Sequence, residues 1–422
     1  MMSNSSIILD AFRTVAAEHD KRLPPLTDDL ALVGEAAGDD LAREVYCILG
    51  MPIDVIDMPS VLRRIDFAAA TSSPLFLSTP NLNFLVNCQS DIEFRDSLLL
   101  SDLSPADGMP IVWLGRLLGV PIMDRVAGSD IFAAIKALRG PEQPLKMFLF
   151  GGDEGVAAAA SHALNVAHGG ALCVGWYYPG FFSLEELSHD LIIDTINSHE
   201  ADFLVVCLGS KKGQLWLKRN SKKLRVPIRA HLGASLKFEA GAVRRAPVIV
   251  QKLGLEWFWR IKEEPCLWKR YWHDGKVLLN LLYSRVLPLI IYRLMTSNLS
   301  RAELTVDAEV EDGCSKLKIS GAAISQNINE IIPALRATLS TNKRVVIDLT
   351  DTCVIDSRFL GLLLALRKSV KSNNAELILT GVSSKLERVF RLNGVDFLLT
   401  STDKDKRGET GTMVSFAKSS TA

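Results

Sequence analysis

The residues whose types and spacing could carry out a reaction gather between Thr79 and Asp130. Asp107 precedes a glycine, and Arg125 follows after an apolar stretch that reads as a helix. A carboxylate in an Asp-Gly turn can act as a general base, and a nearby guanidinium can bind a phosphate. An ordinary turn at Asp107 and a surface ion pair at Arg125 are the alternatives that these two residues leave open.

The segment just before Thr79 predicts that this stretch lies at the carboxyl edge of a sheet. The apolar run Leu75–Leu77 predicts a buried strand, and Thr79 and Asn81 follow at its C-terminal end. Open α/β sheets bind ligands at the carboxyl ends of their strands. We therefore expect Thr79 and Asn81 to lie beside Asp107, although a simple turn after the strand would also account for them.

Two further strand ends could hold an anion. Gly151 lies in the strand–turn–helix stretch Met147–Gly155, where backbone amides at a helix start can bind phosphate; a tight turn explains the glycines equally well. The stretch Phe203–Trp216 reads as a buried strand followed by lysines, which can bind a nucleotide diphosphate as point charges. An incidental solvated loop is the alternative there. The candidate residues at this second end are Gly209, Ser210, Lys212 and Gln214.

Apolar strands alternate with helices along this part of the chain, which predicts an α/β domain with a parallel sheet covered on both faces. Ser129 is expected to cap one helix, and Ser183 with Glu186 forms a capping box for another over Leu184–Ser198. The predicted strands are Val45–Leu49, Leu75–Leu77, Met147–Phe150, Leu172–Trp176, Phe203–Leu208 and Ile228–Leu232.

The composition argues against several classes of function and several kinds of site. The 422 residues are 48% hydrophobic, and 48 basic residues balance 48 acidic ones, which argues against a general nucleic-acid binder. The seven cysteines show no CxxC spacing, which favours reduced, buried thiols over disulfides or metal. The scattered histidines predict no metal site, the N-terminus shows no signal peptide, and no uninterrupted run of about 18 apolar residues predicts a spanning helix.

The composition changes at residues 256–297. Four of the seven tryptophans lie here, and basic residues outnumber acidic ones. The apolar run Val277–Met295 is interrupted by Arg285 and Pro288, so we expect an interfacial helix pair on an anionic membrane that does not cross it. A helical pair packed on the same domain is the alternative. Residues 301–403 restart the strand–helix pattern as a second α/β domain, while 1–43 and 404–422 read as poorly ordered.

Residues from about 44 to 272 resemble the WecG/TagA/CpsF glycosyltransferases, glycosyltransferase family 26, in an ordered set of motifs. The resemblance is specific because the motifs keep their order over more than half of the chain. They are TPN at Thr79–Asn81, ADG at Ala106–Gly108, RVAGSD at Arg125–Asp130, FGG at Phe150–Gly152, YPGFF at Tyr178–Phe182, ADFLVVCLGS at Ala201–Ser210, RRAP at Arg244–Pro247 and LEWFWRIKEEP at Leu255–Pro265.

The resemblance implies a Rossmann-like domain that transfers a sugar, with inversion, from a nucleotide diphosphate sugar to a sugar on a polyprenyl pyrophosphate. Asp107 would be the general base, with Thr79 and Asn81 beside it, and Arg125 would stabilise the leaving diphosphate. No cofactor is implied. Further substrate-binding residues would be Gly151, Gly209, Ser210, Lys212, Gln214, Arg260 and Arg270.

Two positions depart from the family pattern. The family's loop usually reads GSPKQE, and Gly213 stands where its glutamine is expected, with Gln214 next to it. Donor contacts or donor identity are therefore expected to differ. In the C-terminal appendage, Leu267 replaces a usual arginine, for which Lys262 and Lys269 can compensate.

Residues 301–403 resemble a STAS domain, the fold of anti-sigma-factor antagonists, on the stretch Val345–Lys368. Phosphorylatable members read DSSGLG, whereas this chain reads DSRFLG, so Arg358 occupies the usual phosphoserine position. Ser357 remains a possible phosphate acceptor. We favour an interaction module that binds a protein partner without phosphorylation.

The resulting hypothesis divides the chain into a transferase domain (44–255), a membrane-associating appendage (256–297) and the STAS-like domain. It predicts a UDP-sugar-dependent transferase of surface glycan or exopolysaccharide assembly, cytoplasmic and peripheral on the inner membrane. The alternative is a degenerate transferase that acts as a STAS-based regulator. A Rossmann-type dehydrogenase is disfavoured because no strand is followed by GxGxxG.

Overall fold

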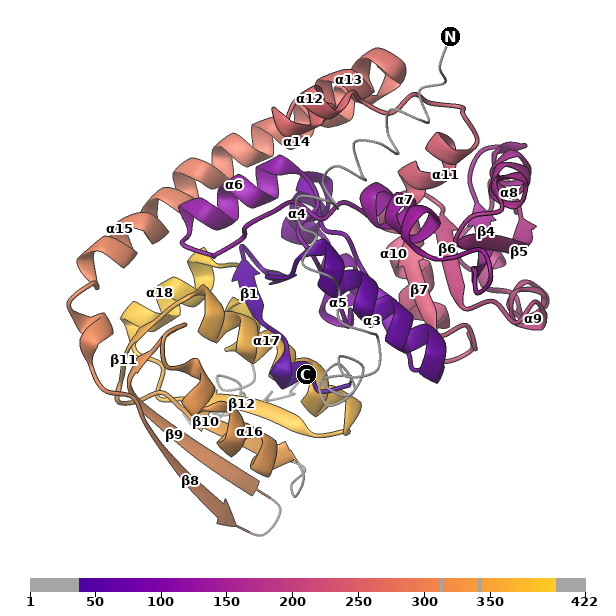
Figure 1. Ribbon diagram of the computed structural model, residues 1–422. Helices are drawn as coiled ribbons and strands as arrows, with labels where there is room; N and C mark the ends of the chain where they lie inside the picture. The colour runs from indigo at the N-terminus through magenta and orange to yellow at the C-terminus, as the bar shows by residue number, and fades with distance from the viewer. Residues whose placement is uncertain (1–37, 312–313, 340–343, 400–422) are drawn as a thin grey trace, which may run out of the picture. The chain divides into compact units, whose positions relative to one another are not determined.

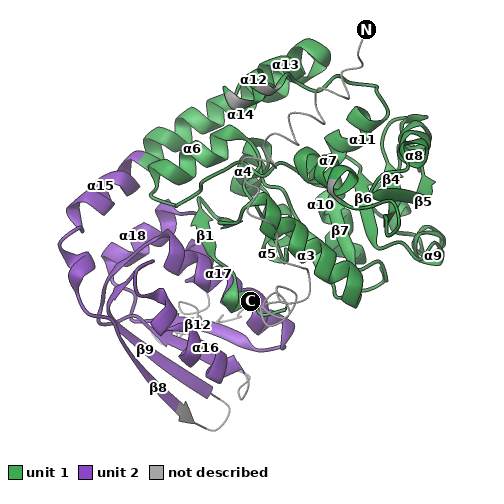
Figure 2. Ribbon diagram, viewed as in Figure 1, with its two compact units in different colours: residues 1–286 green, residues 287–422 purple. Residues whose placement is uncertain are grey.

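A computed structural model describes residues 38–311, 314–339 and 344–399 (Figure 1). It forms two compact units, Met1–Val286 and Leu287–Ala422 (Figure 2). The predicted poorly ordered tail at 404–422 and residues 1–37 of the predicted N-terminal extension lie outside the described residues.

Unit 1 is built on a five-stranded sheet in which every pair is parallel, in the order β3-β7-β6-β4-β5. The predicted parallel sheet is therefore confirmed. Because parallel strands need crossover helices, the sheet is buried on both faces. The strands are β3 (Leu75–Leu77), β4 (Leu145–Gly151), β5 (Ala171–Tyr177), β6 (Phe203–Cys207) and β7 (Ile228–His231).

Two apolar clusters, one on each side of the sheet, hold the helices in place. One cluster joins side chains of α3, α7, α8 and α11 to the sheet, and the other joins α9 and α10 around the buried Trp216. Trp216 also donates to the carbonyl of Leu187 at 2.8 Å. The helices are α3 (Met58–Thr71), α7 (Gly128–Leu138), α8 (Val156–Ala167), α9 (Asp190–Ser198), α10 (Ser210–Asn220) and α11 (Gly233–Glu239).

The first predicted strand lies outside this sheet. β1 (Val45–Ile48) pairs in antiparallel register with β2 (Met51–Asp54), a strand that the sequence pattern did not reveal. Arg43 is buried and donates to Asp54 at 2.7 and 3.1 Å, so the chain is already built into unit 1 before residue 44. The predicted extension therefore ends earlier than expected.

Of the two predicted helix caps, one is confirmed and one is wrong. Ser183 donates its amide to Glu186 at 2.7 Å, and the Glu186 amide donates back to the Ser183 hydroxyl. The helix that follows is interrupted, with a 3₁₀ turn at Glu186–Ser188 before α9. Ser129 caps nothing, because α7 begins at Gly128 with Ala127 at its N-cap.

Three helices close unit 1: α12 (Val248–Lys252), α13 (Glu256–Glu263) and α14 (Trp268–Leu281). α14 continues through a π-helical turn (Leu282–Val286) into α15 (Leu287–Met295) of unit 2. The expectation that Arg285 and Pro288 break this run is wrong. The π-helical turn just before Pro288 changes the backbone pairing where a proline ring would otherwise clash.

The continuous helix Pro265–Met295 is long and apolar enough to cross a membrane, by length and composition alone. The sequence pattern did not predict an uninterrupted helix of this length; the expectation that it does not cross a membrane stays a prediction. Its side chains are mostly exposed. Within unit 1, however, the buried Asp274 accepts from the Asn83 amide at 3.2 Å and Arg285 donates to Gln89 at 2.8 Å. Both partners belong to α4 (Leu82–Ser90), so one side of the helix packs on the domain.

Unit 2 is a five-stranded sheet with order β11-β9-β10-β12, in which β8 pairs with β9 in antiparallel register. The predicted second α/β domain is confirmed. The elements are β8 (Thr305–Glu311), β9 (Cys314–Ala323), α16 (Ile332–Leu339), β10 (Arg344–Asp348), β11 (Thr352–Ile355), α17 (Ser357–Ser372), β12 (Glu376–Thr380) and α18 (Ser384–Leu392).

All seven cysteines are free, as predicted, and four of them are buried. Cys266 is exposed at the start of the long helix, contrary to the expectation of buried thiols throughout.

Gly213 gives the first testable prediction. A Cβ at this position would lie 2.2 Å from Cδ2 of the buried His231 ring at the end of β7. We expect Gly213→Ala to destabilise the protein by about 1–3 kcal/mol, the usual cost of overpacking a core. The measurement is urea unfolding. Gly275→Ala is the control, because a Cβ there meets nothing within 4 Å. A Gly213→Ala protein as stable as the wild type would contradict this packing.

Candidate functional site

Three backbone segments meet at the carboxyl edge of β3. The Asp107 amide donates to the carbonyl of Pro80 at 2.9 Å, and the Val126 amide donates to the carbonyl of Ala106 at 2.9 Å. These bonds bring the turn Ala106–Gly108 between the end of β3 and the segment that carries Arg125. The three motifs that are separate in the sequence are therefore neighbours in the fold.

Thr79 and Asn81 take different positions at this edge. Thr79 is buried, and its hydroxyl oxygen lies 3.1 Å from where a Cβ on Gly128 would be. Asn81 caps α4, accepting from the amides of Asn83 and Phe84 at 3.1 and 3.3 Å. Asn81 also packs beside the Asp107-Gly108 turn, since its Cβ lies 3.9 Å from where a Cβ on Gly108 would be.

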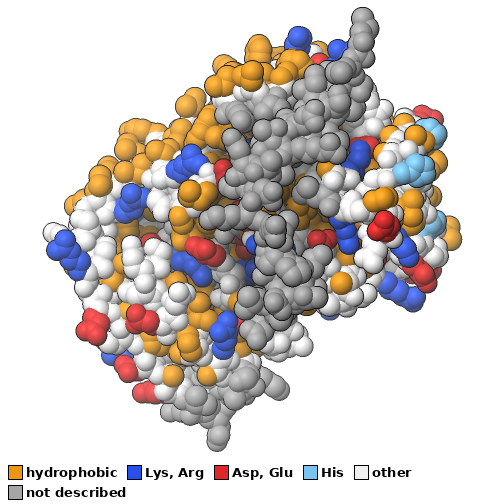
Figure 3. Space-filling model, in the orientation of Figure 1, with side chains coloured by type: hydrophobic (Ala, Val, Ile, Leu, Met, Phe, Trp, Pro, Cys, Tyr) orange, Lys and Arg blue, Asp and Glu red, His pale blue; other side chains and the backbone are white. Residues whose placement is uncertain are grey.

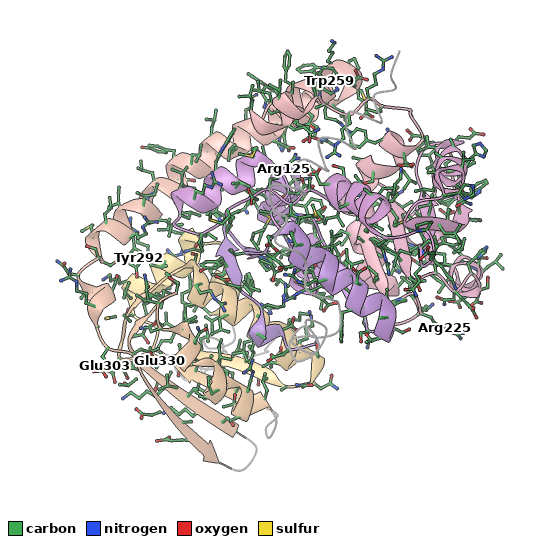
Figure 4. All side chains as sticks on the ribbon, in the orientation of Figure 1. Arg125, Arg225, Trp259, Tyr292, Glu303 and Glu330 are labelled. Atoms are coloured by element: carbon green, nitrogen blue, oxygen red, sulfur yellow. The ribbon has the colours of Figure 1, made fainter. Side chains whose placement is uncertain are left out.

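Arg125 is the centre of a charged cluster, and Figure 4 labels it beside α6 (Met109–Leu117) in unit 1. Its guanidinium pairs with Asp130 at 2.8 Å, pairs with Glu256 of α13, and donates to Gln251 at 3.3 Å. Arg245 pairs with the other carboxylate oxygen of Asp130. The side chain of Arg125 is 13% exposed, so most of it is buried while part of the network still reaches solvent.

Burial and the charged cluster together determine the pKa of the Asp107 carboxyl, which is raised to about 7. Burial is the main cause, the charges of Glu256 and Asp130 add to it, and Arg125 and the Gly128 amide oppose it. The same carboxylates, together with Asp107, raise the pKa of Arg125 although burial lowers it. A carboxyl group with a pKa near 7 can accept a proton at neutral pH and is suited to general-base work.

A second part of the site lies between β4 and β6. The helices that follow these strands, α8 and α10, pack in clusters on opposite faces of the sheet, so the carboxyl ends of β4 and β6 form a topological switch point, where open α/β sheets bind ligands. Gly151 ends β4 with φ 98°, and a Cβ there would lie 2.8 Å from the carbonyl oxygen of Cys207. Only glycine fits this close approach of the two backbones.

The residues that start α10 lie at the same switch point, directly after β6. Gly209 has φ 82°, and a Cβ there would meet nothing within 4 Å. Ser210 donates its hydroxyl to Asn83 at 2.7 Å, and Lys212 donates to the carbonyl of Phe182 at 2.7 Å. Gln214 is instead fully buried and donates to the Ser78 hydroxyl at 2.5 Å, so it supports the end of β3.

The two arginines predicted from the appendage are not brought to Asp107 in the described residues. Arg260 pairs with Glu264 at 2.6 Å and covers the ring of Phe238. Arg270 is exposed beside Tyr271. Among the described residues, no group of His, Cys, Asp or Glu that could hold a metal ion is found.

Sequence reasoning missed four members of the cluster: Asp130, Arg245, Gln251 and Glu256. Asp130, Arg245 and Glu256 lie inside the family-like motifs, but nothing in the sequence indicates that those motifs meet. Their roles became visible only when the fold placed α12 and α13 against the segment at Arg125.

Comparison with known proteins identifies the class. The family described as "Glycosyl transferase WecG/TagA/CpsF family" matches residues 46–289, more than half of the chain. The chain therefore belongs to this family and is a glycosyltransferase. Curated relatives from three Staphylococcus aureus strains, MW2, NCTC 8325 and COL, are each 27% identical over 229 residues, covering 53% of this chain and 85% of the relative. Each is named N-acetylglucosaminyldiphosphoundecaprenol N-acetyl-beta-D-mannosaminyltransferase.

The second unit contains a STAS domain, whose family model matches residues 305–406. Two solved structures of the anti-sigma factor antagonist SpoIIAA are similar to it. The unphosphorylated form shares 14% identity with a TM-score of 0.19, covering 21% of this chain and 82% of that one. The phosphorylated form shares 13% with a TM-score of 0.21, covering 26% and 100%.

The raised pKa of Asp107 gives a prediction about stability. The pKa of this acid rises from 3.8 in the unfolded chain to about 7 in the fold, so the folded protein binds the proton more tightly. As the pH rises from 4 to 7, ionisation of Asp107 therefore lowers the free energy of unfolding. We expect the Asp107→Asn protein to gain stability relative to the wild type as pH rises from 4 to 7, with the gain level above pH 7.

Thermal unfolding across this pH range measures the difference. The control is Asp124→Asn, because Asp124 is an exposed carboxylate next to Arg125. A difference between the Asp107→Asn and wild-type proteins that does not change with pH would contradict the raised pKa.

Proposed function

We propose that this glycosyltransferase transfers a sugar, with inversion, from a nucleotide diphosphate sugar to a sugar carried on a polyprenyl pyrophosphate. A UDP-sugar is the favoured donor, and surface glycan or exopolysaccharide assembly is the process it serves. The observation that carries the proposal is the Asp107 carboxyl, which lies near enough to the Arg125 guanidinium for each to shift the pKa of the other. With a pKa of about 7, this carboxyl can act as a base at neutral pH. The names of the curated relatives give an acceptor of the same class, a sugar diphosphate linked to undecaprenol, and an N-acetylmannosaminyl group as the transferred sugar.

The chemistry follows from this pair. The acceptor hydroxyl oxygen attacks the anomeric carbon of the donor sugar while its proton passes to Asp107. The bond from that carbon to the diphosphate breaks, and the negative charge that develops on the diphosphate is stabilised by Arg125. Arg125 already pairs with Glu256 and Asp130 and donates to Gln251, and its guanidinium keeps further N–H donors that can bind the diphosphate.

The donor's nucleotide diphosphate would bind at the switch point between β4 and β6. Gly209 leaves open space where phosphate oxygens can approach the backbone, while Gly151 allows the close approach of β4 to Cys207 beside it. The amides at the start of α10 are a favourable end for an anion. Ser210 and Lys212 lie in the first turn of α10, and both can turn from their present partners toward a bound donor.

The acceptor requires the enzyme to work at a membrane. Trp268, Trp272, Leu279 and Tyr283 are exposed on the long helix, with Lys276 covering the ring of Trp272. Aromatic and basic side chains on one helix suit the interface of an anionic bilayer. Because Asp274 packs against α4, we place this helix along the domain, peripheral on the cytoplasmic face and not crossing the membrane.

The STAS domain is proposed as a module that binds a protein partner. Asp356 caps α17 by accepting from the amides of Arg358 and Phe359, and a second oxygen of Asp356 accepts from the Ser325 amide at 2.8 Å. Arg358 is buried at the position where phosphorylatable relatives carry serine. We therefore favour partner binding that does not depend on phosphorylation.

A transfer assay tests the proposed function. Wild-type protein is incubated with UDP- and GDP-sugars and a synthetic lipid-linked acceptor, and both released nucleotide and glycosylated acceptor are measured. Asp107→Asn should lower turnover by about 10²–10⁴-fold, the usual loss for a general base. Asp124→Asn should turn over like the wild type. Near-normal turnover by a folded Asp107→Asn protein would contradict the role of Asp107, and absence of wild-type transfer to any lipid-linked acceptor would contradict the function.

A further inference from the structure

Six exposed apolar side chains of unit 1 lie on α6, in the loop before Arg125, and in the α12–α13 region. We call these six side chains the apolar collar. Exposed apolar groups of this size that gather in one place mark binding surfaces. Their exposed fractions are Trp113 47%, Leu117 49%, Met123 76%, Leu253 61%, Trp257 44% and Phe258 63%. In Figure 3, hydrophobic side chains gather along the edge of unit 1 that includes α13 and α14.

The collar is tied to the reaction centre by the chain itself. α6 begins directly after the Asp107-Gly108 turn and carries Trp113 and Leu117. Met123 is two residues before Arg125, and Trp257 and Phe258 follow Glu256, which pairs with Arg125. The segments that carry Asp107, Arg125 and Glu256 therefore each continue into, or follow, exposed apolar side chains of the collar.

Contacts between these segments hold the collar in shape. A Cβ at Gly254 would lie 2.9 Å from the Trp113 ring, so the turn between α12 and α13 packs directly on α6. Arg116 donates to the carbonyl of Ile122 at 3.0 Å and also to that of Met123, which fixes the loop before Arg125. The rings of Trp257 and Phe258 meet edge to face with centroids 5.9 Å apart.

We propose that the collar binds the first isoprene units of the acceptor's polyprenyl chain. This inference rests on the proposed function. An acceptor of that class joins a sugar, a diphosphate and an apolar chain in that order. When its sugar hydroxyl is at Asp107, its chain begins one sugar and one diphosphate away from the reacting oxygen. An apolar surface at the border of a charged cluster matches that order of chemical groups, and flexible Met123 can adapt to a branched chain.

A bilayer could also contact these side chains, and the two sources can be separated in solution. The acceptor series carries the same sugar and diphosphate with a methyl group, two isoprene units or three, each below its micellar concentration and without vesicles. The wild-type KM should fall by about tenfold or more from the methyl to the longest tail, since burial of apolar carbon favours binding.

The test variant is Met123→Ser combined with Phe258→Ser, two strongly exposed positions whose loss does not threaten folding. It should lose most of the dependence of KM on tail length, with the KM for the methyl acceptor and the donor unchanged. Leu191→Ser is the matched control, because Leu191 is 72% exposed on α9, away from the cluster in sequence and element.

Two results would overturn the inference. In one, the double variant keeps the wild-type dependence on tail length. In the other, wild-type KM does not depend on the tail in solution while vesicle flotation falls in the double variant, which would assign the collar to the bilayer. Failure of the proposed function itself would appear differently, as no wild-type transfer to any member of the acceptor series.

Discussion

The contact between Arg125 and its carboxylates is the interaction on which the rest of the site depends. Asp130 and Glu256 hold the guanidinium from two elements far apart in the sequence, and Asp107 is close enough for all three charges to act on its pKa. Two arginines, Arg125 and Arg245, face three carboxyl groups in this cluster. Burial is the main cause of the raised pKa of Asp107, and the charges of Glu256 and Asp130 add to it against Arg125, so Asp107 keeps its proton until the pH approaches neutrality.

The same ion pairs tie the first helix of the appendage to the candidate site. Glu256 lies in the first turn of α13, so α13 is joined to the cluster before the chain turns into the long helix. Lys237 of α11 pairs with Glu264 at the other end of α13 and with Asp153 after β4. α13 is therefore held at both ends by residues of the sheet domain.

The sequence allowed the sheet, the second domain and the neighbourhood of Asp107 to be predicted, because apolar runs and turn residues are local signals. It did not reveal the pairing of Arg125 with Glu256, because residues 131 positions apart are joined only by the fold. It placed Gln214 among substrate contacts, whereas the helical register of α10 turns that side chain into the core. It also treated Pro288 as a break, since a π-helical turn that accommodates proline has no distinct pattern of residues.

The most direct test of the charged cluster is the pH dependence of kcat/KM, which reports the ionisation of the free enzyme's essential base. For the wild type, activity should rise with pH through a midpoint of about 7, the pKa of Asp107. In Glu256→Gln this midpoint should move to lower pH, because the variant removes a negative charge that raises the pKa and frees Arg125 to lower it further. Glu263→Gln, on the same helix, should leave the midpoint unchanged. A midpoint that is the same in wild type and Glu256→Gln would contradict the account.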